Sequence, residues 1–273
     1  MSRETIETDT NECLAYVEDG IAVITLNRPS ARNALSKPML AAFEHALDFA
    51  ERSATVRCVV VTGAGGAFCA GGDVKNMATT RSILMTLDER IHLQRLSQRN
   101  TAGRMHLMPK PVIARLPGAA AGAGFSIALA ADFRVMADTA FITSAFAKVG
   151  FSGDYGGSYF LSSLVGQSKA REIYMLSDRI GADECLRLGI ANRVVAADAL
   201  EAETMAFAGR LADGPPVAYR YMKENFNRVA RGADAIECMD LEATHHVHVG
   251  LTEDHKNAVQ AFINKAKPTF SGN

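Results

Sequence analysis

Residues 57–73 read RCVVVTGAGGAFCAGGD, and this stretch decides the fold class. Its first part, Arg57–Thr62, is apolar and β-branched, which predicts a strand buried in a sheet that helices cover on both faces. A glycine-rich turn, Gly63–Asp73, follows the strand directly. Small residues in such a turn let a ligand approach the main chain closely. The stretch therefore predicts an α/β sheet with a candidate binding turn at the end of one strand.

Strand-like and helix-like segments alternate on both sides of this stretch. Leu14–Val17 and Ile21–Leu26 predict a hairpin that closes through residues 18–20. Ser36 is typical of a helix N-cap, because its hydroxyl can accept a hydrogen bond from the first free N–H groups. The next predicted elements are a helix over 81–107, a strand over 111–115, a Gly/Ala-rich turn over 118–124, a helix over 123–131 and strands over 133–136 and 140–143. This alternation favours an α/β architecture.

The pattern becomes helical in the last quarter of the chain. Helices are predicted over 199–211, 215–229, 235–248 and 254–265. Gly214-Pro215-Pro216 indicates a helix end followed by a new start, because Gly ends helices and Pro is tolerated in a first turn. We therefore predict an α/β core over residues 1–205 and a helical C-terminal subdomain over residues 206–273.

Composition narrows the class of protein. The 273 residues are 48% hydrophobic and carry a net charge of −1, which fits one large core and gives no long-range attraction to nucleic acid or anionic membranes. The five cysteines are scattered without CxxC spacing and indicate reduced thiols, so we expect a cytoplasmic protein. The first residues lack the pattern of a signal peptide. His245, His246 and His248 do not share one helical face, so no metal site is expected.

Two glycine-rich turns are the candidate site. Gly63–Asp73 and Gly118–Gly124 each join a predicted strand to a predicted helix. If the turns converge, the free N–H groups at the following helix starts can provide a pair of donors for one negative oxygen. The alternative is that the glycines only serve the turns. Neither stretch fits the dinucleotide motif GxGxxG.

Motifs along nearly the whole chain occur in the order of one family. They are TLNRP at 25–29, RNAL at 32–35, FCAGGD at 68–73, GAAAGAG at 118–124 with Asp132, LSDRIGADECLRLGIANRVV at 176–195, and AFINK at 261–265 with Pro268 and Phe270. Together they resemble the enoyl-CoA hydratase/isomerase (crotonase) superfamily. The resemblance implies a ClpP/crotonase-like spiral of ββα units that assembles as a homotrimer or as a hexamer of two trimers. It also implies an acyl-CoA thioester substrate and no cofactor beyond that coenzyme A.

The same resemblance implies the positions of the site residues. The backbone N–H groups of Ala70 and Ala123 would hold the thioester oxygen as it becomes negative. The residues implied to contact the substrate or its coenzyme A, the last two often from a neighbouring subunit, are Arg32, Ala34, Gly71, Gly72, Asp73, Val74, Lys75, Phe146, Phe262 and Lys265. Arg28 is a weaker candidate for the phosphates.

The acid/base residue decides the reaction. Hydratases of the family use two glutamates, but Ser126 stands at the first position and the second falls on or next to Phe146. Asp154 falls where several enoyl-CoA isomerases of the family carry a single catalytic carboxylate. A low-polarity pocket lined by Phe146, Phe151 and Tyr155 would raise the pKa of Asp154 and strengthen it as a base. The other interpretation makes Asp154 the N-cap of a helix over 155–164.

We therefore predict an enoyl-CoA isomerase that moves a proton with Asp154. Three alternatives stay open. They are an enoyl-CoA hydratase, a hydrolase that resembles 4-chlorobenzoyl-CoA dehalogenases, and an acyl-CoA binder without catalytic activity. The dehalogenases also use a tryptophan, and this chain has none.

Overall fold

The computed structural model describes residues 3–73 and 85–273, and their strands form two sheets. The large sheet has the order β1-β2-β3-β4-β6-β8-β11, and the small sheet has the order β10-β9-β7-β5. The strands are β1 Glu4–Ile6, β2 Cys13–Glu18, β3 Ile21–Leu26, β4 Cys58–Gly63, β5 Ala67–Cys69, β6 Val112–Leu116, β7 Ala119–Ala121, β8 Phe133–Ala137, β9 Phe141–Thr143, β10 Ile180–Gly181 and β11 Arg193–Val195.

The helices surround these sheets and continue beyond them. They are α1 Lys37–Arg52, α3 Leu87–Gln98, α4 Arg104–Leu107, α5 Ala123–Ala130, α6 Gly157–Leu176, α7 Ala182–Arg187, α8 Leu200–Ala212, α9 Pro216–Ala230, α10 Ala235–Gly250 and α11 Glu253–Ile263. Short helical turns lie at Pro29–Ala31, Arg99–Gly103 and Ala147–Val149. Within residues 3–73 and 85–273, no helix has the length and apolar character that crossing a bilayer requires.

The chain advances as a spiral because consecutive strands alternate between the two sheets. In each of the pairs β4–β5, β6–β7 and β8–β9, the first strand belongs to the large sheet and the second to the small sheet. From β3 to β11 the neighbours in the large sheet run parallel. The predicted α/β class and spiral of ββα units are confirmed. Because β4, β6 and β8 run parallel, the turns that follow them leave the large sheet at the same edge.

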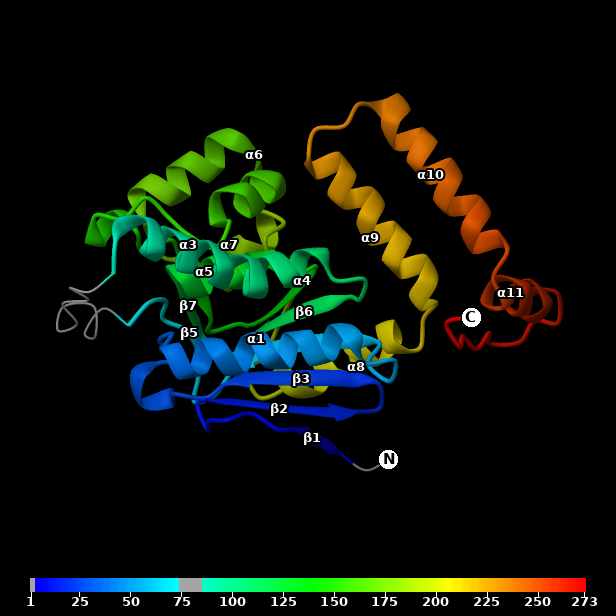
Figure 1. Ribbon diagram of the computed structural model, residues 1–273, viewed down its shortest axis with the longest axis horizontal. Coiled ribbons are helices and arrows are strands. Elements are labelled where there is room, and N and C mark those ends of the chain that lie inside the picture. The colour runs from blue at the N-terminus through cyan, green and yellow to red at the C-terminus, as the bar shows by residue number, and fades with distance from the viewer. Residues whose placement is uncertain (1–2, 74–84) are drawn as a thin grey trace.

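The sequence patterns of the first elements agree with the structure. β2 and β3 form the predicted antiparallel hairpin. Every residue of β4 is buried, as its apolar run requires for a strand covered on both faces. Figure 1 shows α1 in front of the strands and α8 behind them. The Ser36 hydroxyl accepts a hydrogen bond from the Met39 N–H at 3.1 Å, which confirms Ser36 as the N-cap of α1.

Two predicted elements differ from those observed. The first residues of the helix predicted over 81–107 lie outside the described residues, and its first observed helix, α3, begins at Leu87. A π-helical turn at Arg99–Gly103 then separates α3 from α4. The second Gly/Ala-rich turn contains the short strand β7, because alanines 119–121 pair with both β5 and β9. Small side chains fit a strand that has a neighbour on each side and a helix above it.

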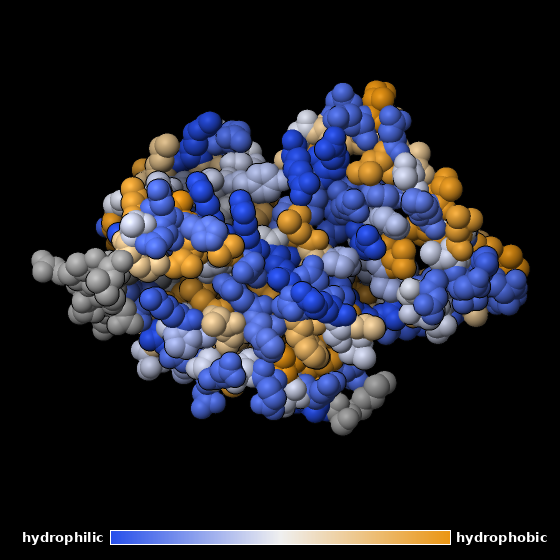
Figure 2. Space-filling model, in the orientation of Figure 1, coloured by the Kyte–Doolittle hydropathy of each residue, from blue (hydrophilic) through white to orange (hydrophobic). Residues whose placement is uncertain are grey.

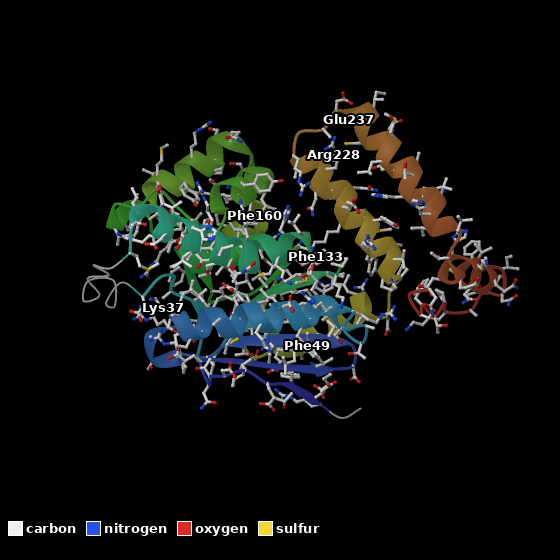
Figure 3. All side chains as sticks on the ribbon, in the orientation of Figure 1. Lys37, Phe49, Phe133, Phe160, Arg228 and Glu237 are labelled. Atoms are coloured by element: carbon white, nitrogen blue, oxygen red, sulfur yellow. The ribbon has the colours of Figure 1, made fainter. Side chains whose placement is uncertain are left out.

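The last three helices extend away from the spiral. Figure 1 shows α9 and α10 as an antiparallel pair with α11 at their far end, whereas α8 stays beside the large sheet. Arg228 of α9 pairs with Glu237 of α10 at 3.1 Å, at the end of the helix pair that Figure 3 labels. The helix end and restart at residues 214–216 is confirmed. The domain boundary at residues 205/206 falls within α8 and stays a prediction.

Apolar side chains remain exposed on these helices. Figure 2 shows them as orange atoms along the edge formed by α10 and α11. The exposed fraction is 75% for Phe226, 73% for Leu251 and 85% for Phe262. A single chain therefore leaves large apolar groups in water on this part of the molecule.

Candidate active site

The first glycine-rich turn is held by a buried asparagine. The Asn33 amide donates hydrogen bonds to the main-chain oxygens of Ala64 and Ala67, at 2.9 and 2.8 Å. Asn33 is fully buried and has a left-handed backbone with φ 58°, which asparagine tolerates better than most residues. These bonds fix the path of the chain from β4 into β5. In the sequence, Asn33 is marked only by its place in the RNAL motif, and the role of its side chain follows from the structure.

The two glycine-rich turns meet, as predicted. A Cβ atom at Gly124 would lie 2.6 Å from the Cβ of Cys69, so only glycine lets the first turn of α5 pack on the end of β5. A Cβ atom at Gly71 would lie 3.3 Å from the Ala123 nitrogen. The Gly71-Gly72 segment therefore lies directly over the N-terminus of α5. Cys69 is completely buried between the turns, in agreement with a packing role.

One of the two predicted N–H donors is corrected. The Ala70 N–H donates a hydrogen bond of 2.9 Å to the Arg32 main-chain oxygen, so it is not available to a ligand in this structure. The Gly72 N–H, two residues later, forms no hydrogen bond with the residues that the structure describes. Gly71, which lies between them, has a positive φ of 91°, so the segment is not a regular extended strand there. The Gly72 N–H is therefore the candidate donor of this turn, because the Ala70 N–H is already bound.

The second predicted donor, the Ala123 N–H, lies at the start of a helix. Ala123 is the first residue of α5, where the N–H has no partner within the helix. No acceptor for it is found in the described part of the chain. The Ala123 side chain is 3% exposed and packs in the hydrophobic core. The site thus offers the Gly72 and Ala123 N–H groups on neighbouring turns.

Asp154 is a half-buried acid, and its buried Oδ1 has no hydrogen-bond partner among the residues that the structure describes. Burial raises the pKa of its carboxyl to about 6. The N-cap interpretation is wrong, because α6 begins after Gly156 and no side chain caps it. A buried carboxyl oxygen that lacks a partner is costly and is usually found where function requires it.

The backbone around Asp154 is strained and fastened to α3. Gly153, Tyr155 and Gly156 have positive φ angles of 115°, 47° and 74°. For a bulky residue such as Tyr155 this conformation is unfavourable. The Tyr155 N–H donates to the Gln98 side chain at 2.9 Å, and its hydroxyl lies 3.3 Å from the Ser97 hydroxyl. These contacts with the end of α3 compensate for the strain and fix the loop.

An aromatic cluster occupies the region of the two glutamate positions of hydratases. The ring of Phe146 stacks on Tyr174 with centroids 5.6 Å apart, and Phe125 contacts Tyr174 edge-on. Ser126, at the other glutamate position, is fully buried. The expected apolar wall is only partly correct, because Phe146 and Tyr155 are buried but Phe151 is 58% exposed.

Only some of the residues predicted to contact the nucleotide of coenzyme A lie together in the structure. Arg28 donates to the Ala34 main-chain oxygen at 2.6 Å and to the Asp73 carboxylate at 3.2 Å. It therefore joins RNAL to FCAGGD and is not a free cation for phosphate. Arg32 lies beside the same turn through its contact with Ala70. Val74 and Lys75 lie outside the described residues.

The C-terminal candidates are remote from this turn within one chain. Phe262 and Lys265 lie on or just after α11, whereas Figure 1 shows β5 at the opposite end of the molecule. Both side chains are exposed. They can contribute to a coenzyme A pocket only if they belong to another subunit.

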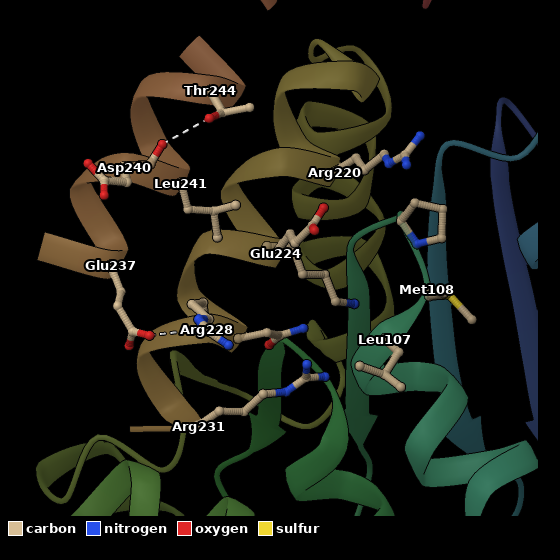
Figure 4. A pocket seen from close by; sticks show the side chains of 13 residues that line it. Leu107, Met108, Arg220, Glu224, Arg228, Arg231, Glu237, Asp240, Leu241 and Thr244 are labelled. Atoms are coloured by element: carbon tan, nitrogen blue, oxygen red, sulfur yellow. Dashed lines mark hydrogen bonds and ion pairs between the residues drawn. The ribbon is translucent and has the colours of Figure 1, made fainter. Parts of the chain in front are cut away.

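A separate cavity of about 950 Å³ lies between α9, α10 and the end of α4. Figure 4 shows Arg228 and Glu237 paired across it, and Lys223 is held by Asp132 at 2.8 Å. None of its lining residues is among the predicted site residues. His245 packs nearby, stacked on Tyr221 and 2.6 Å from the Asn225 side chain, which fits a structural role.

Comparisons with known proteins match this chain to one family over nearly its full length. The profile of the family described as Enoyl-CoA hydratase/isomerase matches residues 16–273. A protein named Probable enoyl-CoA hydratase from Rhodobacter capsulatus is 35% identical over 94% of this chain and 96% of its own. The 1,2-epoxyphenylacetyl-CoA isomerase of Escherichia coli is 31% identical over 95% of this chain and 98% of its own.

The similarity to this family also holds for the three-dimensional structure. An enoyl-CoA hydratase from Polaromonas sp. JS666 superposes with a TM-score of 0.88 at 34% identity, over 94% of this chain and 99% of that one. The predicted crotonase-like fold is therefore confirmed. With its spiral, its two meeting glycine turns and its matching profile, the chain belongs to the enoyl-CoA hydratase/isomerase family of the crotonase superfamily.

Proposed function

We propose that this enzyme shifts the double bond of an enoyl-CoA, with Asp154 as the single acid and base. The carboxylate removes a proton from the α-carbon of a 3-enoyl-CoA, and the electron pair moves onto the thioester oxygen. The protonated Asp154 then returns the proton to the γ-carbon, which gives the 2-enoyl-CoA. One carboxyl group suffices, because it is base in the first step and acid in the second.

The observation that carries this proposal is that the buried Oδ1 of Asp154 has no hydrogen-bond partner in the described part of the chain. Its pKa of about 6 lets it take and return a proton near neutral pH. Water activation by two glutamates has no counterpart, since Ser126 and Phe146 stand at those positions and Phe146 lies in an aromatic cluster. This environment favours proton transfer between carbons over addition of water.

The N–H groups of Gly72 and Ala123 are the proposed oxyanion donors. Main-chain donors placed where negative charge develops act without reorganisation, and removing one typically lowers the rate by about 10²–10³-fold. The Ala123 N–H also lies at the positive end of α5. Ala70, the donor first predicted, is replaced by Gly72 in this proposal.

The acyl-CoA substrate would bind along the first glycine turn, with its thioester at Gly72 and the rest of the coenzyme A along Ala34, Gly71 and Asp73. Phe262 and Lys265 would complete that pocket from a neighbouring subunit. The exposed apolar residues of α9 to α11 support an assembly of this chain with itself. A homotrimer or a hexamer of two trimers stays the prediction, and sedimentation equilibrium measures it. A cytoplasmic location likewise stays a prediction.

The test is α-proton exchange in D₂O and turnover of 3-enoyl-CoA, wild type against Asp154→Asn. The wild type is expected to exchange and isomerise, and the variant to bind the CoA ester but lose turnover by at least about 10²-fold. Equal turnover by the variant would remove Asp154 from the mechanism. Absence of any exchange by the wild type, with the ester bound, would indicate the non-catalytic binder.

Hydration is the second candidate, and the name of the Rhodobacter capsulatus relative favours it. Loss of the enoyl absorbance of crotonyl-CoA measures this reaction. Rapid loss that requires Asp154 would make the enzyme a hydratase with a single acid. Release of halide from 4-chlorobenzoyl-CoA would indicate the hydrolytic alternative.

A further inference from the structure

The peptide group that joins Asp154 to Tyr155 is held at both of its ends. Its carbonyl oxygen, which belongs to Asp154, accepts a hydrogen bond of 3.1 Å from the Gly157 N–H. Its N–H, which belongs to Tyr155, donates at 2.9 Å to the side-chain oxygen of Gln98 on α3. A peptide group is planar, so these two bonds fix its orientation as one unit. The backbone next to the Asp154 side chain is therefore held by one bond within its loop and one from another helix.

The Asp154 carboxyl depends on this peptide group for its position. Its buried Oδ1 has no hydrogen-bond partner among the described residues, so no bond at that atom orients the acid. Gly153 and Gly156, with φ angles of 115° and 74°, stand on either side of the Asp154-Tyr155 pair, and glycine gives the chain wide conformational freedom. Tyr155 itself has φ 47°, which is unfavourable for a bulky residue. The loop therefore needs contacts from outside to keep the acid in one place.

Tyr174 of α6 lies under this loop and limits its movement by packing. A Cβ atom at Gly153 or at Gly157 would lie 2.7 Å from the Tyr174 hydroxyl oxygen, so the hydroxyl occupies the space that side chains there would take. The Tyr174 ring stacks on Phe146 with centroids 5.6 Å apart. Gln98 acts on the same loop from α3, through a hydrogen bond that also has a preferred direction.

The end of α3 gives Gln98 a firm position. A π-helical turn at Arg99–Gly103 follows Gln98 directly, and such turns occur frequently at functional sites. Within it, the hydroxyl of the fully buried Thr101 donates at 2.7 Å to the main-chain oxygen four residues earlier. The Asn100 side chain donates at 3.3 Å to the Glu44 carboxylate of α1. Gln98 therefore contacts the loop from a helix end that is bonded both within itself and to α1.

We propose that Gln98 is a positioning residue for the catalytic base and acts through its hydrogen bond with the Tyr155 N–H. The inference rests on the proposed isomerase function of Asp154. The Gln98 side-chain oxygen keeps the peptide after Asp154 in the orientation that directs the carboxyl to the substrate carbon, and Gln98 itself does not touch the substrate. A displacement of catalytic groups by about 1 Å can lower the rate about 10²-fold. The role requires a hydrogen-bond acceptor at this place, not only a side chain of the same length.

The main test replaces Gln98 by a residue of similar length that cannot accept this bond. Gln98→Met is expected to lower kcat for a 3-enoyl-CoA about 10-fold and to leave KM within about 2-fold, because the base is displaced while substrate binding is unchanged. Gln98→Glu keeps an acceptor at the same place, so its kcat at pH 8 is expected to stay within about 3-fold of the wild type. Gln94→Met is the matched control with wild-type kcat, because Gln94 is exposed one turn earlier on α3.

The pH profile gives a readout that a change in packing alone would not produce. The described titratable groups that interact electrostatically with Asp154 are Cys69, Tyr155 and Tyr174. Burial raises the pKa of each of these three groups, so they are neutral at pH 8. The carboxylate of the Gln98→Glu variant would add a like charge beside Asp154 and raise its pKa further. The fall of kcat/KM on the acidic side is therefore expected to move to higher pH in this variant.

Circular dichroism and thermal unfolding show whether each variant is folded at the assay temperature. Four results would each overturn the role of Gln98: wild-type kcat in Gln98→Met, a loss that Gln98→Glu does not restore, a loss that follows the unfolded fraction, and an unchanged pH profile in Gln98→Glu. The proposed function is tested separately. A wild type without α-proton exchange or turnover would reject that function, whereas an active wild type with an equally active Gln98→Met variant would reject only the role of Gln98.

Discussion

At the scale of single residues, the site depends on a few groups that the fold leaves without partners. Asp154 lacks a hydrogen-bond partner on its buried oxygen, and the Gly72 and Ala123 N–H groups have no acceptor in the described part of the chain. Folded proteins satisfy nearly all buried polar groups. The unpartnered Asp154 oxygen and the two free N–H groups are therefore the groups through which we expect a ligand to bind.

Asp154 is expected to reduce stability at neutral pH. Its pKa in the folded chain, about 6, is above its ordinary value of about 3.9, so the folded chain holds the proton more tightly. That contribution to stability is present below about pH 4 and is lost as pH rises through 6. Asp154→Asn should therefore raise the free energy of unfolding at pH 8 by on the order of 1–2 kcal/mol, allowing for partial exposure, and change it little at pH 4.

Urea denaturation at the two pH values measures this effect. A destabilisation by Asp154→Asn that is equal at pH 4 and pH 8 would show that the carboxyl is not held with a raised pKa.

The Ala123 N–H can be removed with little damage to its helix. Ala123 is the first residue of α5, a position where proline is well tolerated. Ala123→Pro should lower kcat/KM by at least about 10²-fold, because the donor is lost and the ring occupies the space of the anion. The matched control is Ala235→Pro at the first residue of α10, which should keep wild-type activity. Steady-state kinetics with circular dichroism as a check of folding decide the outcome.

At the scale of elements, the contact between β5 and α5 places the two donors side by side. Gly124→Ala would put a Cβ atom 2.6 Å from the Cys69 Cβ and force the helix away from the strand. We expect a destabilisation of about 1–3 kcal/mol and a loss of activity at a temperature where the variant is folded.

Gly209→Ala in α8 is the control for the same substitution. A Cβ atom there meets nothing within 4 Å, and alanine favours the helix, so a gain of about 0.5–1 kcal/mol is expected. Thermal unfolding of both variants measures the difference. A Gly124→Ala variant with wild-type stability and activity would contradict the close packing of β5 on α5.

The prediction of elements from the sequence succeeded where the pattern is local. The β2–β3 hairpin, the buried β4 and the Ser36 cap follow from turn residues, β-branched runs and hydroxyl chemistry. It failed for β7, because three alanines have no strand signal of their own and pair only through β5 and β9. It also failed for Asp154 as a cap, because α6 begins three residues after the acid, at Gly157.

At the scale of the whole molecule, Lys223 connects the C-terminal helices to the spiral. Its ammonium group, on α9, lies 2.8 Å from the Asp132 carboxylate and 2.8 Å from the Met105 oxygen. Burial raises the pKa of the Asp132 carboxyl, and Lys223 opposes this rise. Removing the lysine would leave a buried carboxyl without its charge partner.

Lys223→Met is therefore expected to lower the free energy of unfolding by about 3 kcal/mol. Lys256→Met, which removes an exposed pair with Glu253, should change it by no more than about 0.5 kcal/mol. Chemical denaturation at a fixed protein concentration compares the two, because assembly would otherwise contribute to stability. Equal effects of the two variants would show that Lys223 does not fasten α9.

The sequence by itself determined the α/β class, the spiral implied by the ordered motifs, Asp154 as a candidate base and Ala123 as a candidate donor. These depend on local patterns and on residues that stand at fixed places in motifs. Only the tertiary structure decided that the Ala70 N–H is bound to Arg32, that Gly72 offers the free amide, and that Tyr174 lies under the loop of Asp154. The physical reason is that hydrogen-bond partners and burial arise from contacts between residues far apart in the chain, and no local pattern specifies them.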